Sequence, residues 1–326
     1  MEISVVVCTR DRSASLARCL ASLARLAPPP HEVVVVDNAP SNGETARVVA
    51  ATPFRYVRED SPGLDRARNR GIAEARHDLV AFTDDDVEAD PGWLRALAAP
   101  FADLGVAGVT GRVLPASLET PAERLFQSYG NGMDKGDAPR RFDPALLKPA
   151  DLLRAQAVGV GANMAFRRRA LAAVGGFDPD LDAGTPAAGA GDLDLFHRLL
   201  AAGFVLRYEP AAVVHHHHRR TIPELRRQLR DNGRSYVFYL RKVWRRRTVP
   251  RPAVARFAAG WAAWLAGRLA RGLLGRHRLP VGLLWEELAG ALTAFLSSPP
   301  HPRRSAPPAP SRRPAPGSRS SPRAPD

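Results

Sequence analysis

The chain has 326 residues, of which 45% are apolar, enough to bury a sizeable core in one large domain or two small ones. Its two cysteines, Cys8 and Cys19, exclude a disulfide-stabilised secreted scaffold, and we expect both thiols to be reduced. The N-terminus "MEISVVVCTR" has an acid at position 2 and no small-residue cleavage pattern. It therefore predicts a strand instead of a signal peptide, and a cytoplasmic location.

The net charge of +14 is unevenly distributed along the chain. Residues 219–326 hold 23 Arg and Lys against 5 Asp and Glu, whereas the first 218 residues hold 24 against 28. The basic C-terminal third favours a partner that carries phosphates, either a nucleic acid or an anionic membrane surface. Because no zinc-finger, RRM or KH signature is present, no nucleic acid is expected. The prediction is a protein peripheral to the inner face of the cell membrane.

Strands and helices alternate over the first 110 residues. The predicted strands are apolar throughout, so they should form a parallel sheet that helices cover on both faces. Such an α/β sheet binds ligands at the carboxyl ends of its strands. The segments read as strands are 3–9, 31–38 and 77–86, and those read as helices are 13–26 and 63–75.

The remaining chain divides into regions of different character. Residues 115–155 are rich in loops, 159–178 read as strand, helix and Gly-rich turn, 191–204 as a capped helix, and 205–220 as edge strands that run into a basic loop. We predict three regions: an α/β domain over 1–220, a basic helical segment over 221–298, and a disordered Pro/Ser/Arg tail over 299–326.

Two apolar segments of the helical region bear on the membrane prediction. The longest uncharged apolar stretch, 257–267, is about half of the roughly 20 residues that a spanning helix needs. The helix predicted over 281–296 has one apolar face, formed by Val281, Leu284, Leu288, Leu292 and Phe295, with Glu286 and Glu287 off it. These helices either lie on a membrane surface or pack on the α/β domain.

Acidic residues follow two of the predicted strands. Asp37 closes "VVVVDN", and Asp84, Asp85 and Asp86 close "LVAFTDDD". If the strand continues, Asp84 and Asp86 face the ligand crevice and Asp85 faces away, because alternate side chains point the same way. Paired carboxylates suit a divalent cation, Mg²⁺ or Mn²⁺, together with substrate phosphates. A solvated turn is the alternative, but the preceding strand and Asp37 favour a site.

Six segments in this order and spacing resemble the family 2 glycosyltransferases, which have a GT-A fold. The segments are "SVVVCTRDR", "VVVVDNAPS", "GLDRARNRGI", "VAFTDDDV", "GANMAFRRRALAAVGGFDPDL" and "GDLDLFHRLLAAGF". The resemblance covers roughly residues 3–220. It implies an enzyme that transfers a sugar from a nucleotide diphosphate donor to a hydroxyl acceptor with inversion, with a divalent cation as cofactor. The acceptor would be a sugar, a lipid-linked molecule or another hydroxyl compound.

The same resemblance implies roles for individual residues. It places Asp86 on the metal, Asp84 at the ribose, and Thr9, Arg10 and Asp37 at the nucleotide base. The residues implied in nucleotide-sugar binding are in all Thr9, Arg10, Asp37, Arg68, Asn69 and Asp84. For Arg68 and Asn69 a solvated helix face is the alternative.

The resemblance also implies a general base near the acceptor and a histidine ligand of the metal. Asp192 occupies the position of the general base, and Gly191 stands where the family usually has Glu. A plain helix N-cap is the alternative for Asp192, and Asp194 would complement the helix dipole. In the run "VVHHHHRR", the resemblance implies a metal ligand, and His215 or His217 suits that role; a surface loop is the alternative.

Two other functions remain open at this point. A nucleotidyltransferase shares the nucleotide-binding sheet, but it typically has a Gly-rich loop after the first strand, and "CTRDRSAS" has no glycine. A noncatalytic adaptor would use the basic third to bind a membrane or a nucleic acid.

Overall fold

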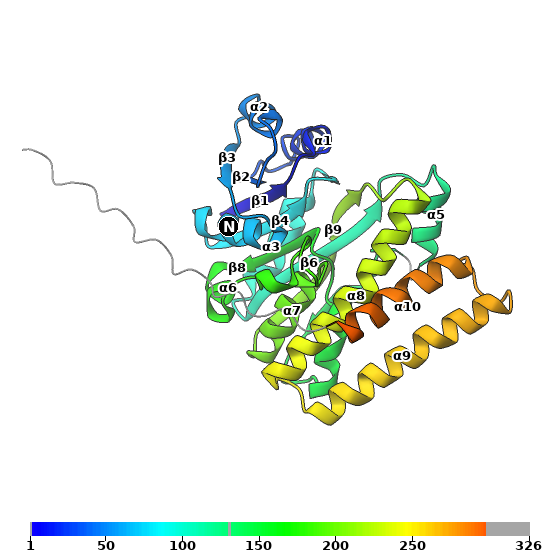
Figure 1. Ribbon diagram of the computed structural model, residues 1–326. Helices are drawn as coiled ribbons and strands as arrows, with labels where there is room; N and C mark the ends of the chain where they lie inside the picture. The colour runs from blue at the N-terminus through cyan, green and yellow to red at the C-terminus, as the bar shows by residue number, and fades with distance from the viewer. Residues whose placement is uncertain (1, 130–131, 298–326) are drawn as a thin grey trace, which may run out of the picture.

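The computed structural model describes residues 2–129 and 132–297 (Figure 1). The predicted tail, 299–326, lies outside the described residues. Within these residues one sheet has the strand order β3-β2-β1-β4-β8-β6-β9-β5, and β7 pairs with β9. The strands are β1 (Ile3–Thr9), β2 (Glu32–Asn38), β3 (Arg55–Glu59), β4 (Leu79–Asp84), β5 (Val87–Ala89), β6 (Val106–Pro115), β7 (Arg140–Phe142), β8 (Asn163–Arg167) and β9 (Val205–His216).

The N-terminal half of the sheet is parallel, as predicted. Strands β3, β2, β1 and β4 pair in parallel, and β8 then runs antiparallel to both β4 and β6. Every residue of β1 is buried, with Val6 in one apolar cluster and Val5 and Val7 in the other. Apolar side chains on both faces require two covering layers, and this explains why the strands are not alternating in sequence.

Helices cover both faces of the sheet. The first seven are α1 (Ser13–Leu23), α2 (Glu44–Ala50), α3 (Leu64–Glu74), α4 (Trp93–Ala98), α5 (Pro121–Ser128), α6 (Arg168–Val174) and α7 (Gly191–Ala201). Side chains of α1 and α4 join the cluster that contains Val5, and side chains of α3, α6 and α7 join the cluster that contains Val6. Short 3₁₀ segments lie at Ala99–Ala102 (η1), Pro149–Ala157 (η2) and Pro179–Leu181 (η3).

The structure differs from the sequence prediction in two connecting regions. Strand β9 is not an edge strand, because it pairs with β6, β5 and β7. The loop-rich region contains α5, which begins with a capping box in which Thr120 and Glu123 satisfy each other's backbone amides. A Thr followed three residues later by Glu is a sequence signal for a helix start, so α5 was predictable.

Three further helices form the C-terminal part: α8 (Ile222–Arg246), α9 (Arg251–Leu273) and α10 (Val281–Leu296), which lie side by side next to the sheet (Figure 1). Helix α8 packs on the α/β region, since Tyr239 and Val243 belong to the same apolar cluster as Leu195 and Phe196 of α7. Among the described helices, none combines the length and the apolar character needed to cross a membrane.

Helix α10 buries a different face from the one its leucines predict. It crosses α8 so closely that a Cβ at Gly233 would clash with the Glu287 carbonyl, and one at Gly290 with the Arg230 carbonyl. Small residues therefore set the interface. The buried positions are Leu283, Leu284, Glu287, Gly290, Ala291 and Ala294. Leu292 and Phe295 of the predicted face are instead 45% and 72% exposed.

Candidate active site

The acidic trio lies where β4 and β9 end. Strand β4 ends at Asp84, and the antiparallel register of β5 with β9 sets His216 opposite Val87, directly beside Asp86. His216 Nε2 lies 3.3 Å from Asp86 Oδ1. One ligand atom from each of Asp84, Asp86 and His216 lies within 4.8 Å of the others. Two carboxylates and an imidazole are a donor set that Mn²⁺ or Mg²⁺ accepts, so these residues fit a divalent cation.

His215, predicted as the metal ligand, lies outside this cluster. Its Nε2 is 2.9 Å from Asp90 Oδ1, and His217 Nε2 is 2.8 Å from Glu88 Oε1. The alternation along β9 is as expected, but the even-numbered histidines face the acids. The sequence cannot show whether His215 and His217 or His216 and His218 face the site, because the four residues are identical. The register of β9 with β5 decides it.

The neighbouring His218 orients the His216 ring. Their Nδ1 atoms lie 3.1 Å apart, and the His218 ring packs edge-on against Phe126 at 4.7 Å. Burial lowers the pKa of His218 to about 4, so this ring is neutral at neutral pH. A neutral His218 can accept the Nδ1 proton of His216, and a bound cation would take the place of the Nε2 proton that otherwise faces Asp86.

Asp85 does not turn away from the crevice, in contrast to the sequence prediction. Its Oδ2 accepts a hydrogen bond from Thr9 Oγ1 at 2.7 Å, and its Oδ1 accepts one from Arg12 Nη1 at 2.7 Å. The strand ends at Asp84, so strand alternation no longer applies at the turn that follows. Burial raises the pKa of Asp85 to about 6, against the opposing effect of Arg12.

Arg12 is a site residue that the sequence reasoning missed. It bridges the acids, donating to Asp85 and, through Nη2, to Asp86 Oδ2 at 2.7 Å. Burial by itself would raise the pKa of Asp86, but His216 and Arg12 outweigh it and hold this pKa well below its usual range. The sequence did hold a signal for such a residue, because three adjacent carboxylates require cationic side chains nearby.

A cavity of about 370 Å³ opens at the carboxyl ends of the parallel strands. Its wall includes Thr9, Arg10, Asn38, the acidic trio, His216 and Arg219. Asp37, predicted to hold the base, is not on this wall. It is fully buried and accepts a hydrogen bond from Tyr56 Oη at 2.9 Å, while the adjacent Asn38 faces the cavity.

Arg68 and Asn69 do not lie on a solvated helix face. Arg68 is buried, with Nη1 3.1 Å from Asp65 Oδ1 and Nη2 3.5 Å from Asp84 Oδ1. It thus connects α3 with the acidic trio. Asn69 instead holds the backbone of Phe177 through both amide atoms, at 2.8 and 2.9 Å.

Asp192 is the second residue of α7 and does not cap it. The N-cap is Ala190, with φ 76°, while Asp192 Oδ2 accepts a hydrogen bond from the Gly161 amide at 2.8 Å. A Cβ at Gly161 would lie 2.9 Å from Arg68 Nη2 and 3.1 Å from Asp192 Oδ2. Gly161 therefore lies between these two side chains, which brings Asp192 to the Arg68 side of the acidic trio.

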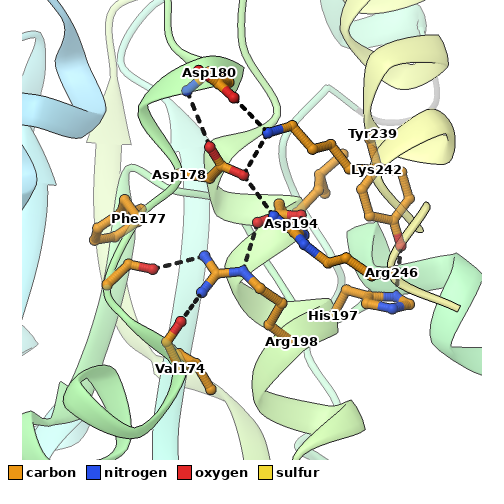
Figure 2. Close-up of polar contacts among 12 residues, drawn as sticks. Val174, Phe177, Asp178, Asp180, Asp194, His197, Arg198, Tyr239, Lys242 and Arg246 are labelled. Atoms are coloured by element: carbon orange, nitrogen blue, oxygen red, sulfur yellow. Dashed lines mark hydrogen bonds and ion pairs between the residues drawn. The ribbon is translucent and has the colours of Figure 1, made fainter. Parts of the chain in front are cut away.

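Ion pairs anchor the first turn of α7, the turn that carries Asp192. Figure 2 shows Asp194 between Arg198 and Arg246, and Lys242 between Asp178 and Asp180. Arg198 also donates to the carbonyls of Val174 and Gly176. Because Arg246 belongs to α8, this helix braces the first turn of α7 through Asp194, while Lys242 of α8 holds the preceding Asp178 and Asp180.

Comparisons with known proteins agree with this geometry. The family model of Glycosyl transferase family 2 matches residues 4–175. The Pre-mycofactocin glycosyltransferase of Mycobacterium tuberculosis is 32% identical over 249 residues, which cover 73% of this chain and 46% of that protein. The Glucosyl-dolichyl phosphate glucuronosyltransferase of Haloferax volcanii is 27% identical over 192 residues, which cover 55% of this chain and 56% of that protein. The chain thus spans about half the length of these curated relatives.

A solved structure supports the fold. The mannosyltransferase PcManGT from Pyrobaculum calidifontis, in complex with GDP-Man and Mn²⁺, superposes with a TM-score of 0.62 at 19% identity, covering 90% of this chain and 87% of that one. The GT-A fold expected from the sequence is confirmed, and the nucleotidyltransferase alternative is set aside. The chain belongs to glycosyl transferase family 2.

Proposed function

We propose that this enzyme transfers a sugar from a nucleoside diphosphate sugar to a hydroxyl acceptor, with a divalent cation at Asp84, Asp86 and His216. The observation that carries the proposal is the convergence of these three side chains at the cavity of about 370 Å³, which we call the donor cavity. The related mannosyltransferase was solved with GDP-Man and Mn²⁺, which supports the same classes of donor and cation here.

The chemistry assigns a task to each side of the site. A bound cation would neutralise charge on the departing diphosphate. Asp192, held by the Gly161 amide, accepts the proton of the acceptor hydroxyl while that oxygen bonds to the anomeric carbon. The bond from the anomeric carbon to the phosphate oxygen breaks, and the nucleoside diphosphate leaves. Attack from the opposite face inverts the anomeric centre.

The test is Mn²⁺ binding followed by electron paramagnetic resonance, in the presence of UDP, GDP or dTDP. His216→Ala should weaken Mn²⁺ binding by about tenfold or more, because it removes a ligand. His215→Ala is the matched control, since its ring contacts Asp90 outside the cluster, and it should bind Mn²⁺ like the wild type. Equal affinity in all three proteins would refute the assigned metal site.

We further propose that the exposed face of α8, α9 and α10 lies on an anionic membrane surface on the cytoplasmic side. Residues of all three helices line a largely apolar groove of about 510 Å³. Beside it Trp244, Leu292, Phe295 and Leu296 are exposed. Arg241 lines the groove, and the Arg251 guanidinium lies 5.1 Å from the Trp244 ring centroid. Apolar side chains flanked by arginines suit the interface of anionic lipids.

Sedimentation with vesicles tests this surface. The protein should sediment with phosphatidylglycerol vesicles and not with phosphatidylcholine vesicles, and high salt should release it. Replacing both Phe295 and Leu296 by Ser should weaken binding. The control is Leu104→Ser, an exposed apolar residue outside the three helices. Binding that survives the double substitution would exclude this face.

A further inference from the structure

A second cavity, of about 780 Å³, lies between α9, α8 and η2, beside the first turn of α7. Its wall includes Leu193, the residue that follows Asp192. Asp192 itself is tied through Gly161 to Arg68 and the acidic trio. The proposed base therefore lies between the acidic trio and Leu193, a residue of this cavity's wall.

The wall carries three cations without partners. Lys135, Arg154 and Arg256 line the cavity, and none has a hydrogen-bond or ion-pair partner for its side chain among residues 2–129 and 132–297. Burial lowers the pKa of Lys135, and the charge of Asp192 opposes this, which places the ammonium within electrostatic reach of the base. A half-buried, unpaired ammonium at this position is suited to an anion.

The acid on the same wall does not neutralise these cations. Glu287 accepts a hydrogen bond from Arg268 Nη1 at 2.7 Å and another from the Tyr129 hydroxyl. The Arg268 guanidinium also lies 4.4 Å from the Trp264 ring centroid. Glu287 is thus used in holding α9 to α10, and the three cations remain available to a ligand.

Aromatic side chains line the same cavity as the cations. The rings of Tyr236 and Trp261 lie 4.9 Å apart at 46°, and Phe257 lies 6.4 Å from Tyr236. Trp261 lines both this cavity and the apolar groove of α8, α9 and α10. An apolar chain that leaves the cavity past Trp261 would therefore enter a continuous apolar surface.

We propose that this cavity is the acceptor site and that the acceptor is an anionic amphiphile. Its anionic group, a phosphate or a carboxylate, binds Lys135 close to the hydroxyl that Asp192 deprotonates, and its apolar part runs along Trp261 into the groove. This inference rests on the proposed transferase function. Arg154 and Arg256 are exposed to solvent, so Lys135 is the cation that distinguishes between ligands: a neutral sugar would leave its half-buried ammonium unpaired, and a free phosphate would leave the aromatic side chains unused.

The experiment measures binding to the full chain by calorimetry with three probes: octyl phosphate, octyl glucoside and inorganic phosphate. The two octyl compounds are used below their critical micelle concentrations. Octyl phosphate should bind tightest. Lys135→Met should weaken octyl phosphate by about tenfold and leave octyl glucoside unchanged. Trp261→Ala should weaken both octyl compounds and leave inorganic phosphate unchanged. The matched controls are Lys148→Met and Trp285→Ala, which lie outside both cavities.

Two outcomes would overturn the proposal. One is wild-type affinity of Lys135→Met for octyl phosphate, and the other is inorganic phosphate binding as tightly as octyl phosphate, which would indicate a site for a free anion. Donor binding and Mn²⁺-dependent donor hydrolysis are measured on the same proteins. A wild type that binds octyl phosphate but no nucleotide sugar would refute the transferase function, whereas normal donor hydrolysis with no selective loss in Lys135→Met would refute the acceptor site alone.

Discussion

The carboxylate of Asp65 lies against Gly191, so close that a Cβ at position 191 would clash with Asp65 Oδ2. The first residue of α7 is the position where the family resemblance leads us to expect Glu. Here Asp65 of α3 places its carboxylate in the same space. The Oδ1 atom of Asp65 lies 3.1 Å from Arg68 Nη1. Burial raises the pKa of Asp65 to about 8, although Arg68 opposes the shift. Asp65 therefore places its carboxylate in the space that the side chain of a Glu at position 191 would enter.

The first prediction concerns the pH dependence of stability. A raised pKa means that the unfolded chain ionises Asp65 between about pH 4 and pH 8 while the folded chain keeps the proton. The contribution of Asp65 to stability is largest below pH 4 and is lost as the pH rises toward 8, by about 1.4 kcal/mol per pH unit at most. Asp65→Asn should therefore raise the melting temperature more at pH 8 than at pH 5.

The control for this comparison is Asp60→Asn, an exposed aspartate, which should change the melting temperature little at either pH. A shift for Asp65→Asn that is the same at pH 5 and pH 8 would show that Asp65 is not protonated in the folded chain.

The second prediction tests whether positions 65 and 191 compensate for each other. Gly191→Glu alone should destabilise the protein and lower transfer, because its side chain meets the Asp65 carboxylate. Adding Asp65→Ala should recover most of the stability, so the two effects should be strongly non-additive. Chemical denaturation of the two single variants and the double variant measures this coupling. Additive free energies would contradict it.

The third prediction concerns Asp85, for which the sequence alone suggests a mild role. Asp85→Ala should destabilise the fold by about 1–3 kcal/mol, because it leaves the Thr9 hydroxyl without its acceptor and removes one of the two carboxylates that Arg12 binds. Nucleotide binding should weaken as well. Glu88→Ala, whose carboxylate pairs with His217 at the surface, is the control. Wild-type stability and nucleotide affinity in Asp85→Ala would show that the Thr9 and Arg12 contacts are dispensable.

The fourth prediction addresses the brace between α7 and α8 (Figure 2). Arg246→Met should cost about 3 kcal/mol of stability, because the fully buried Asp194 loses one of its two arginines. Arg245→Met, at an exposed position one residue away, should cost little. Urea unfolding of both variants gives the comparison, and equal midpoints would mean that the brace adds nothing. Asp194→Asn would weaken the same two ion pairs and destabilise the fold, so it cannot serve as the control variant for Asp192→Asn.

Much of the fold follows from local sequence. The continuous apolar runs predict β1, β2 and β4, and Leu16, Leu20 and Leu23 predict the buried face of α1, because these signals do not depend on distant residues. The position of the acids at the end of β4 follows from the same pattern.

What the sequence could not supply depends on contacts between distant elements. The register of β5 with β9 selects His216 over His215, and the end of β4 turns Asp85 toward Thr9. The close crossing at Gly233 and Gly290 buries small residues of α10 and leaves Leu292 and Phe295 exposed. In each case the local pattern allows more than one arrangement, and tertiary packing decides between them.

Turnover of Asp192→Asn at saturating donor and Mn²⁺, with the anomeric configuration of the product read by NMR, tests the central claim most directly. Asparagine keeps an oxygen for the Gly161 amide but cannot take up the proton. We predict a loss of transfer of about a hundredfold or more, donor affinity within about twofold of wild type, and an inverted product from the wild-type enzyme. Near-normal transfer by Asp192→Asn, or a retained configuration in the wild-type product, would contradict the assignment of Asp192 as the base of an inverting transferase.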